Sequence, residues 1–294
     1  MPQPPWRAKV GVATERRQAR AVGDHDRSDV LEGLASWAAG CSPARGAAAP
    51  SATPGECTGI ARLGYRPCVF VPPPVVLVHG VISSRYLLPT VRELARVTRV
   101  LVPDLPGVGA HRWSGVPAFA GHADAVAEAI VDWTGSPVTV AGHSLGAEVV
   151  VELARRHASL VHRAVLIGPT GDPAAGGVFG VGKRWMTTSV SEPLSFNLLT
   201  FTELARIGPL RMASLLRRSF QDPVETKLSE LRCPTLLVRG ERDRVAPASW
   251  LERMARRIPD VRIVTVAGSS HTLVYTDPRT LAELVLEPFS RLAP

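Results

Sequence analysis

The chain has 294 residues, of which 45% are hydrophobic and 20% charged, and its formal net charge is +8. This composition is typical of a soluble globular protein with one large core, and no apolar run reaches the ~20 residues of a membrane-spanning helix. The basic residues are mostly arginines scattered along the chain without interleaved aromatics, which argues against nucleic-acid binding.

Residues 1–56 mix Arg, Ala, Pro, Gly and Ser, and only residues 29–39 have the spacing of a short amphipathic helix. We therefore predict a disordered or weakly ordered N-terminal extension over residues 1–56. The first residues lack the apolar core of a signal peptide, so the expected location is the cytoplasm. Residues 58–71 are expected to supply the first strands as an antiparallel pair.

From residue 75 onward, apolar strand-like segments alternate with helix-like segments. Strands are expected near residues 75–79, 99–102, 138–142, 163–167, 235–239 and 261–266. Helices are expected near residues 86–97, 119–133, 145–157, 248–257 and 278–291. This alternation predicts a mostly parallel sheet with helices on both faces.

One turn in this pattern places a serine where a nucleophile is expected. Residues 138–141 have the pattern of a buried strand and residues 147–157 that of a helix, with Gly142-His143-Ser144-Leu145-Gly146 between them. In a G-x-S-x-G sequence at a strand-to-helix turn, the serine takes a strained conformation and projects its hydroxyl above the sheet. Ser144 is therefore the candidate nucleophile.

A serine hydroxyl needs a base, and the base needs an orienting group. Asp243 follows the strand expected at 235–239, and His271 follows the strand expected at 261–266. Loops at the carboxyl ends of parallel strands meet at one edge of a sheet. Both side chains are therefore expected to converge above Ser144.

The remaining element of an acyl-transfer site is a pair of backbone N–H groups directed at the developing oxyanion. Leu145 follows the nucleophile, and Val81 lies in the loop after the strand at 75–78, so these two residues are the candidates. His79, just before Gly80, is interpreted as a structural residue that holds this loop. No histidine is grouped with cysteines or carboxylates at metal-ligand spacing, so we expect no metal and no other cofactor.

With these residues in this order, the chain resembles the α/β-hydrolase family over roughly residues 60–292. Supporting segments lie at residues 102–107, 163–169, 231–243 and 271–278. The resemblance implies a mostly parallel eight-stranded sheet, with Ser144 as nucleophile, His271 as base and Asp243 as acid. Some relatives carry the acid after the preceding strand, which makes Asp172 the alternative. Residues 107–112 depart from the Gly-x-Gly-x-Ser that family members often have.

Between residues 168 and 231 the alternation stops, and the resemblance implies an inserted helical cap. The expected domains are the N-terminal extension, a core of residues 57–168 and 232–294, and a cap of residues 169–231. A helical lid with an apolar underside would exclude water and enclose an apolar substrate. Trp185, Met186 and Phe201 are the candidate substrate-binding residues of this cap.

A serine nucleophile argues against dehalogenase and epoxide-hydrolase chemistry, for which the family uses Asp. The expected protein is a serine hydrolase that cleaves an ester, thioester or related acyl bond of a small apolar substrate through an acyl-enzyme. The same triad also serves carbon–carbon bond hydrolysis, acyl transfer and cyclisation in biosynthetic pathways, and these alternatives stay open. A hydrolase-like protein that only binds a ligand is less favoured. The expected partner is a small acyl substrate, and the sequence leaves the oligomeric state open.

Overall fold

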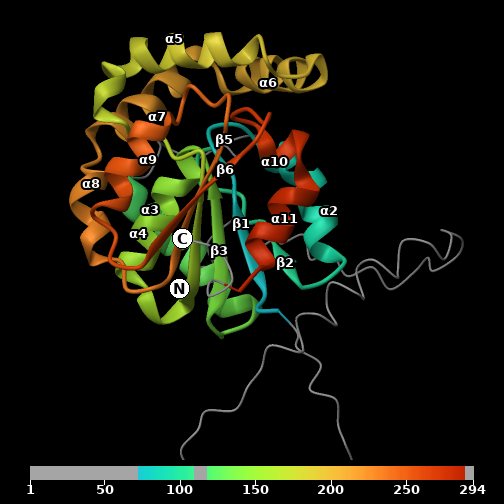
Figure 1. Ribbon diagram of the computed structural model, residues 1–294, viewed down its shortest axis with the longest axis vertical. Coiled ribbons are helices and arrows are strands. Elements are labelled where there is room, and N and C mark those ends of the chain that lie inside the picture. Colours follow the sequence, from blue (N-terminus) through green and yellow to red (C-terminus); the bar gives the residue numbers. More distant parts are fainter. Residues whose placement is uncertain (1–71, 109–117, 289–294) are drawn as a thin grey trace, which may run out of the picture. The chain divides into compact units, whose positions relative to one another are not determined.

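The computed structural model describes residues 72–108 and 118–288 (Figure 1). Within these residues, six parallel strands form one sheet in the order β2-β1-β3-β4-β5-β6. The strands are β1 Val75–Val78, β2 Val100–Leu101, β3 Val138–His143, β4 Val161–Ile167, β5 Thr235–Gly240 and β6 Val261–Val266. The parallel arrangement is confirmed, with six described strands instead of the expected eight. The expected antiparallel pair at 58–71 and the extension 1–56 lie outside the described residues.

Helices cover both faces of this sheet because its strand residues alternate between two apolar cores. Val76 and Val140 belong to the core that includes residues of α3, α4 and α9, whereas Leu77 and Ala141 belong to the core that includes residues of α2, α10 and α11. The six helices are α2 Leu88–Ala95, α3 Phe119–Trp133, α4 Leu145–Arg156, α9 Ala248–Ala255, α10 Leu273–Thr276 and α11 Pro278–Leu286. Strands buried on both faces explain the continuous apolar runs in the sequence.

The direction in which successive strands are added to the sheet changes between β1 and β3. From β1 the chain goes to β2 on one side, then returns to add β3, β4, β5 and β6 on the other side. In parallel α/β sheets, such a switch point leaves a crevice at the carboxyl ends of the two strands. Val78 is paired with Gly142 in this register, so the segments after β1 and β3 leave the sheet side by side.

Four helices are inserted between β4 and β5: α5 Gly177–Ser189, α6 Leu194–Ile207, α7 Pro209–Gln221 and α8 Val224–Lys227. One buried carboxylate anchors this insertion, because Asp172 accepts a hydrogen bond from Arg184 of α5 at 2.6 Å and another from Arg253 of α9. Burial alone would raise the pKa of Asp172, but the two arginines and the Ala174 N–H outweigh it and lower the pKa.

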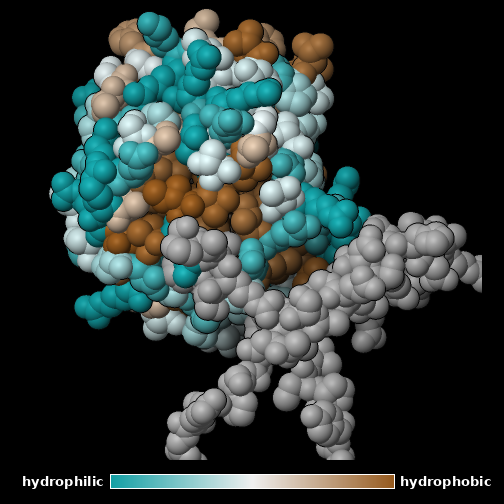
Figure 2. Space-filling view, viewed as in Figure 1, coloured by the Kyte–Doolittle hydropathy of each residue, from teal (hydrophilic) through white to brown (hydrophobic). Residues whose placement is uncertain are grey.

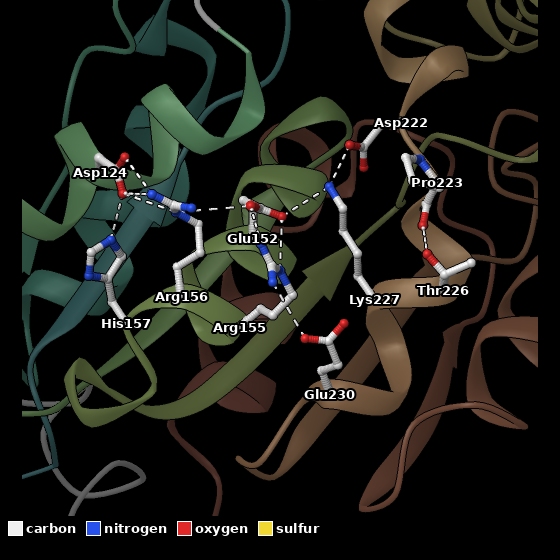
Figure 3. Close-up of polar contacts among 10 residues, drawn as sticks. All are labelled: Asp124, Glu152, Arg155, Arg156, His157, Asp222, Pro223, Thr226, Lys227 and Glu230. Atoms are coloured by element: carbon white, nitrogen blue, oxygen red, sulfur yellow. Dashed lines mark hydrogen bonds and ion pairs between the residues drawn. The ribbon is translucent and has the colours of Figure 1, made fainter.

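A second set of charged side chains joins α3, α4 and α8 (Figure 3). The buried Glu152 carboxylate binds Arg155 at 2.8 Å and Lys227 of α8 at 2.9 Å. Arg156 at the end of α4 binds Asp124 of α3 at 2.9 Å. These contacts fix the helix that follows Ser144 against its neighbours on both sides.

Candidate active site

Ser144 stands at a sharp turn between β3 and α4, with φ 57° and ψ −123°. It is the one non-glycine residue with positive φ in the part of the chain that the structure describes. Such backbone costs on the order of 1–3 kcal/mol and persists only where the surroundings impose it. The surroundings of Ser144 impose it, because the backbone is tightly packed on both sides of the turn. A Cβ at Gly142 would lie 2.3 Å from the Gly146 carbonyl oxygen, and a Cβ at Gly146 would lie 2.5 Å from the Val78 carbonyl oxygen.

Asp243 and His271 form a buried pair, with 2.9 Å between Asp243 Oδ2 and His271 Nδ1. The other carboxylate oxygen, Oδ1, accepts the N–H groups of Val245 and Ala246 at 2.8 and 2.9 Å. The carboxylate is therefore held by its own turn and directed at the imidazole. Because Nδ1 faces a carboxylate, it carries the proton of neutral His271, which leaves Nε2 as the proton acceptor.

The turn that carries Asp243 is itself held by a buried arginine. The Arg239 guanidinium at the end of β5 donates to the carbonyl oxygens of Glu241, Asp243 and Ala246, each at 3.0 Å. An arginine suits this position because its planar fork presents several donors at once. These bonds fix the loop independently of the imidazole.

The pKa of His271 reflects this setting. Burial alone would lower it, but the charge and hydrogen bond of Asp243, together with the charge of Glu192, raise the pKa above its ordinary value. The imidazolium is thus stabilised in the folded protein. A base that must hold a proton during a reaction benefits from such stabilisation.

The elbow and the Asp–His pair lie at the ends of neighbouring strands. The Ser144 N–H donates to the carbonyl oxygen of Ile167, the last residue of β4, at 2.8 Å. At the next residue, Gly168, a Cβ would lie 3.0 Å from His271 Nδ1 and 3.1 Å from Asp243 Oδ2. The structure therefore brings Ser144, Asp243 and His271 to one edge of the sheet.

The two expected oxyanion donors flank the same serine. Leu145 is the first residue of α4, so its N–H has no acceptor within the helix. Val81 follows Gly80, where a Cβ would lie 3.2 Å from the Cβ of Ser144. The backbone after β1 thus passes directly beside the nucleophile position.

His79 holds this loop, in agreement with its structural interpretation. Its Nε2 accepts the Leu105 N–H at 3.0 Å, so Nδ1 carries the proton and donates to the Gly80 carbonyl oxygen at 2.9 Å. Burial is the largest influence on its pKa and lowers it. The neutral imidazole, with one hydrogen bond at each ring nitrogen, therefore holds the loop in place.

Sequence reasoning missed a buried chain of hydrogen bonds through Tyr86 and His143. The Gly80 N–H donates to the Tyr86 hydroxyl oxygen at 2.7 Å, and His143 Nε2 lies 2.9 Å from the His271 carbonyl oxygen. Nε2 must therefore carry the proton, and Nδ1 accepts from the Tyr86 hydroxyl at 3.0 Å. Burial lowers the pKa of His143 to about 3, which keeps it in this neutral form. The chain connects the loop after β1 to the backbone of His271.

Glu192, in the turn between α5 and α6, is a further residue that the sequence did not reveal. Its buried carboxylate accepts the N–H of Thr272 at 3.2 Å and also the Thr272 hydroxyl. Nearby, the ring of Phe196 at the start of α6 lies 6.2 Å from that of Tyr86 and 5.5 Å from that of Tyr275. The inserted helices therefore contact the segment that carries His271.

Two of the three cap residues expected to bind substrate lie exposed on the surface of the insertion. Met186 is 70% exposed and Phe201 is 73% exposed, and Phe201 lies on the opposite side of α6 from Phe196. Trp185 is half-buried on α5. Phe196 is the aromatic residue of α6 that contacts the surroundings of the site.

Neither a metal-binding cluster nor a membrane-spanning helix is present among the described residues. No group of three or more His, Cys, Asp or Glu side chains among them is arranged to hold a metal ion. No helix in that part of the chain has both the length and the apolar composition to cross a membrane.

Comparison with known proteins extends these observations. Residues 75–284 match the alpha/beta hydrolase family. A pimeloyl-(acyl-carrier protein) methyl ester esterase of Aromatoleum aromaticum is 25% identical over 246 residues, covering 72% of this chain and 96% of that protein. A thermophilic esterase from Thermogutta terrifontis aligns with TM-score 0.61 and 24% identity, over 72% of this chain and 87% of that one. A meta-cleavage product hydrolase from Pseudomonas fluorescens aligns with TM-score 0.59 and 20% identity, over 75% and 92%. The match over most of the chain shows that this protein belongs to the alpha/beta hydrolase family.

Proposed function

We propose that the protein is a serine esterase that hydrolyses an ester of a small apolar acyl group through an acyl-enzyme. The observation that supports this most is the strained Ser144 turn beside a buried Asp243–His271 pair with a 2.9 Å contact. The methyl ester esterase activity in the name of the 25% identical relative supports an ester over other acyl bonds. The aromatic contacts of Phe196 with Tyr86 and Tyr275 beside the site support an apolar substrate.

In this mechanism the Ser144 hydroxyl attacks the ester carbonyl while His271 Nε2 takes its proton. Asp243 fixes the tautomer of His271 and stabilises the imidazolium that forms. The N–H groups of Leu145 and Val81 bind the oxyanion, and the loss of one such donor costs about 100- to 1000-fold in kcat. His271 then protonates the leaving alcohol, and a water molecule, activated by the same imidazole, releases the acid and restores Ser144.

The proposal is tested by labelling the purified protein with a fluorophosphonate, which reacts only with an activated serine. Wild-type protein and the Ser84→Ala variant should be labelled and should hydrolyse p-nitrophenyl butyrate, whereas Ser144→Ala should do neither. Loss of the triad nucleophile costs about a millionfold in the best-studied case. Turnover of this ester by Ser144→Ala at the wild-type rate would overturn the proposal.

The substrate class would then be determined with a panel of methyl esters, thioesters and compounds with a hydrolysable carbon–carbon bond. The kcat/KM values for these three classes distinguish an esterase from the alternative activities. We expect short- and medium-chain methyl esters to give the highest kcat/KM. Preferred cleavage of a carbon–carbon bond would keep the triad but reject esterase as the function.

A further inference from the structure

The inserted helices expose a concentration of large apolar side chains. Seven of the ten exposed large hydrophobic residues in the described chain lie between residues 179 and 210, and among them Phe179 is 93% and Leu194 86% exposed. Isolated exposed apolar residues need no explanation, but a group of them marks an interaction surface. Figure 1 shows α5 and α6 along one edge of the described unit, and Figure 2 shows brown residues along that same edge.

Helix α6 has its apolar stripe on the outside. Leu194, Leu198 and Phe201 follow one another at i, i+4 and i+7, so they share one face of the helix, and all three are exposed. The inward face carries Thr200 and Glu203 together with Phe196 and Ile207, and all four are buried, so α6 is apolar on both faces. A helix that serves only its own protein places its polar side chains outward. The outer stripe of α6 is therefore built to be covered by something else.

Helix α5 continues this surface and adds a cation to it. Phe179, Lys183, Met186 and Val190 follow at i, i+4, i+7 and i+11, and all four are exposed. We call these four residues together with Leu194, Leu198 and Phe201 the cap stripe. A lysine within an apolar stripe can extend its ammonium past the apolar layer while its methylene stem stays in it.

The exposed charges of helices α5, α6 and α7 have one sign, although α8 and its flanks add the carboxylates Asp222, Glu225 and Glu230 to the insertion. Residues 177–221 contain six basic residues and only two acidic ones, Glu192 and Glu203, both of which are buried. The exposed charges of this segment are Lys183, Arg206, Arg217 and Arg218. Apolar helices with Lys and Arg at their surface are the pattern of helices that lie in the interface of an anionic membrane.

We propose that the cap stripe docks onto an anionic lipid surface, with α5 and α6 lying flat in the interface. A second copy of the chain fits less well, because a twofold contact uses the same patch twice and would bring two Lys183 ammonium groups into one apolar interface. An acidic protein would satisfy the cations, but it would bury its own charges against the Leu194–Leu198–Phe201 face. Lipid satisfies both the apolar stripe and the cations. This inference concerns the outer face of the insertion and does not depend on the proposed catalytic activity.

The test is flotation of the full chain with vesicles of phosphatidylglycerol and phosphatidylcholine, compared with vesicles of phosphatidylcholine alone. We expect the wild-type protein to float with the anionic vesicles and to be released by high salt. The Leu198→Ser/Phe201→Ser double variant should bind at least about tenfold more weakly, since each large side chain contributes that order of affinity when buried. Val131→Ser, on an exposed position of α3, removes an apolar side chain elsewhere and should bind as wild type does.

A matched pair of charge-reversal variants tests the contribution of Lys183 to binding. Lys183→Glu should weaken binding to the anionic vesicles, whereas Arg257→Glu changes the net charge equally at an exposed position outside the insertion and should have the smaller effect. Light scattering of the same proteins provides the oligomeric state. Absence of flotation, flotation that the stripe variants do not change, or a wild-type dimer that the stripe variants convert to a monomer would each overturn the lipid proposal.

Discussion

Asp172 and Asp243 follow the neighbouring strands β4 and β5, but their carboxylates bind different groups. Asp172 is bound by Arg184 and Arg253, so its charge is neutralised by cations of the insertion and of α9. Asp243 is bound by backbone N–H groups on one oxygen and by His271 on the other. Only the second arrangement leaves a carboxylate that can orient a base.

We therefore expect Asp243→Asn to lower kcat/KM by about ten thousandfold, as the loss of the orienting acid does in a serine protease. Asp172→Asn should keep activity within about tenfold but lower the melting temperature, because it leaves two arginines without their buried partner. Ester hydrolysis and thermal unfolding of both variants check this. The opposite ranking of activities would make Asp172 the acid.

Glu192 leads to a prediction about pH. Its charge is one of the influences that raise the pKa of His271, and the base must be neutral to accept a proton from Ser144. Removal of that charge in Glu192→Gln should lower the pKa of His271, so the acidic limb of the kcat/KM profile should move to lower pH. The other ionisable groups facing His271 are Asp243 and His143, and both remain in this variant.

Thr272→Val is the matched control for this experiment. It removes the hydroxyl that binds Glu192 but keeps the charge, so its acidic limb should stay near that of wild type even if kcat falls. An unshifted limb in Glu192→Gln would mean that the contact between the insertion and Thr272 is structural only.

Among the helices, α4 combines the nucleophile turn with an unusual buried carboxyl one turn later. Glu148 Oε1 accepts the hydroxyls of Thr170 at 2.5 Å and of Ser219 on α7, while its Oε2 is buried without a hydrogen-bond partner. Burial, the largest influence, raises the pKa of Glu148 to about 8 in spite of these hydroxyls. The helix thus meets the insertion through a carboxyl that is mostly protonated at neutral pH.

This pKa makes stability depend on pH in a defined direction. The folded-state pKa lies above the unfolded value of 4.5, so the stabilising contribution is complete below that value and is lost as pH rises to about 8. Glu148→Gln cannot ionise, so its melting temperature relative to wild type should increase between pH 5 and pH 8.5, by the equivalent of a few kcal/mol. Glu283→Gln, at an exposed carboxylate, should show no such trend in the same thermal scans. A constant difference for Glu148→Gln would contradict the shifted pKa.

The elements with continuous or periodic apolar patterns could be predicted from the sequence, because burial against the sheet determines those patterns. The positions of the six strands along the chain and the turn at Ser144 are of this kind, whereas the order of the strands in the sheet was not predicted. Tyr86 and Glu192 could not be found in this way, because periodicity does not reveal hydrogen bonds to residues far along the chain. The sequence also did not indicate which face of α6 is buried. Phe196 and Phe201 lie on opposite faces of this helix and both are apolar, so the apolar pattern does not distinguish the two faces.

At the scale of the whole molecule, the family match over residues 75–284 takes in most of the residues that the structure describes, 72–108 and 118–288. The composition of residues 1–56 remains the basis for the prediction of a weakly ordered extension. Limited proteolysis should therefore cut within residues 1–56 first and leave a core that keeps its esterase activity. Mass spectrometry of the fragments and an activity assay check this. First cuts within the sheet, or activity lost together with residues 1–56, would contradict it.

The sheet order also determines when the protein becomes active during its synthesis. Ser144 leaves the central strand β3, but His271 follows β6, which is the edge strand and the last strand of the described chain to be made. Chains fold from the N-terminus as the ribosome extends them. The serine turn can therefore form well before the proposed base, His271, has been translated, and we expect the nascent chain to be inert toward esters. Recovery of activity in a refolding or cell-free translation experiment should report docking of β6, later than any signal from the formation of β3 and α4.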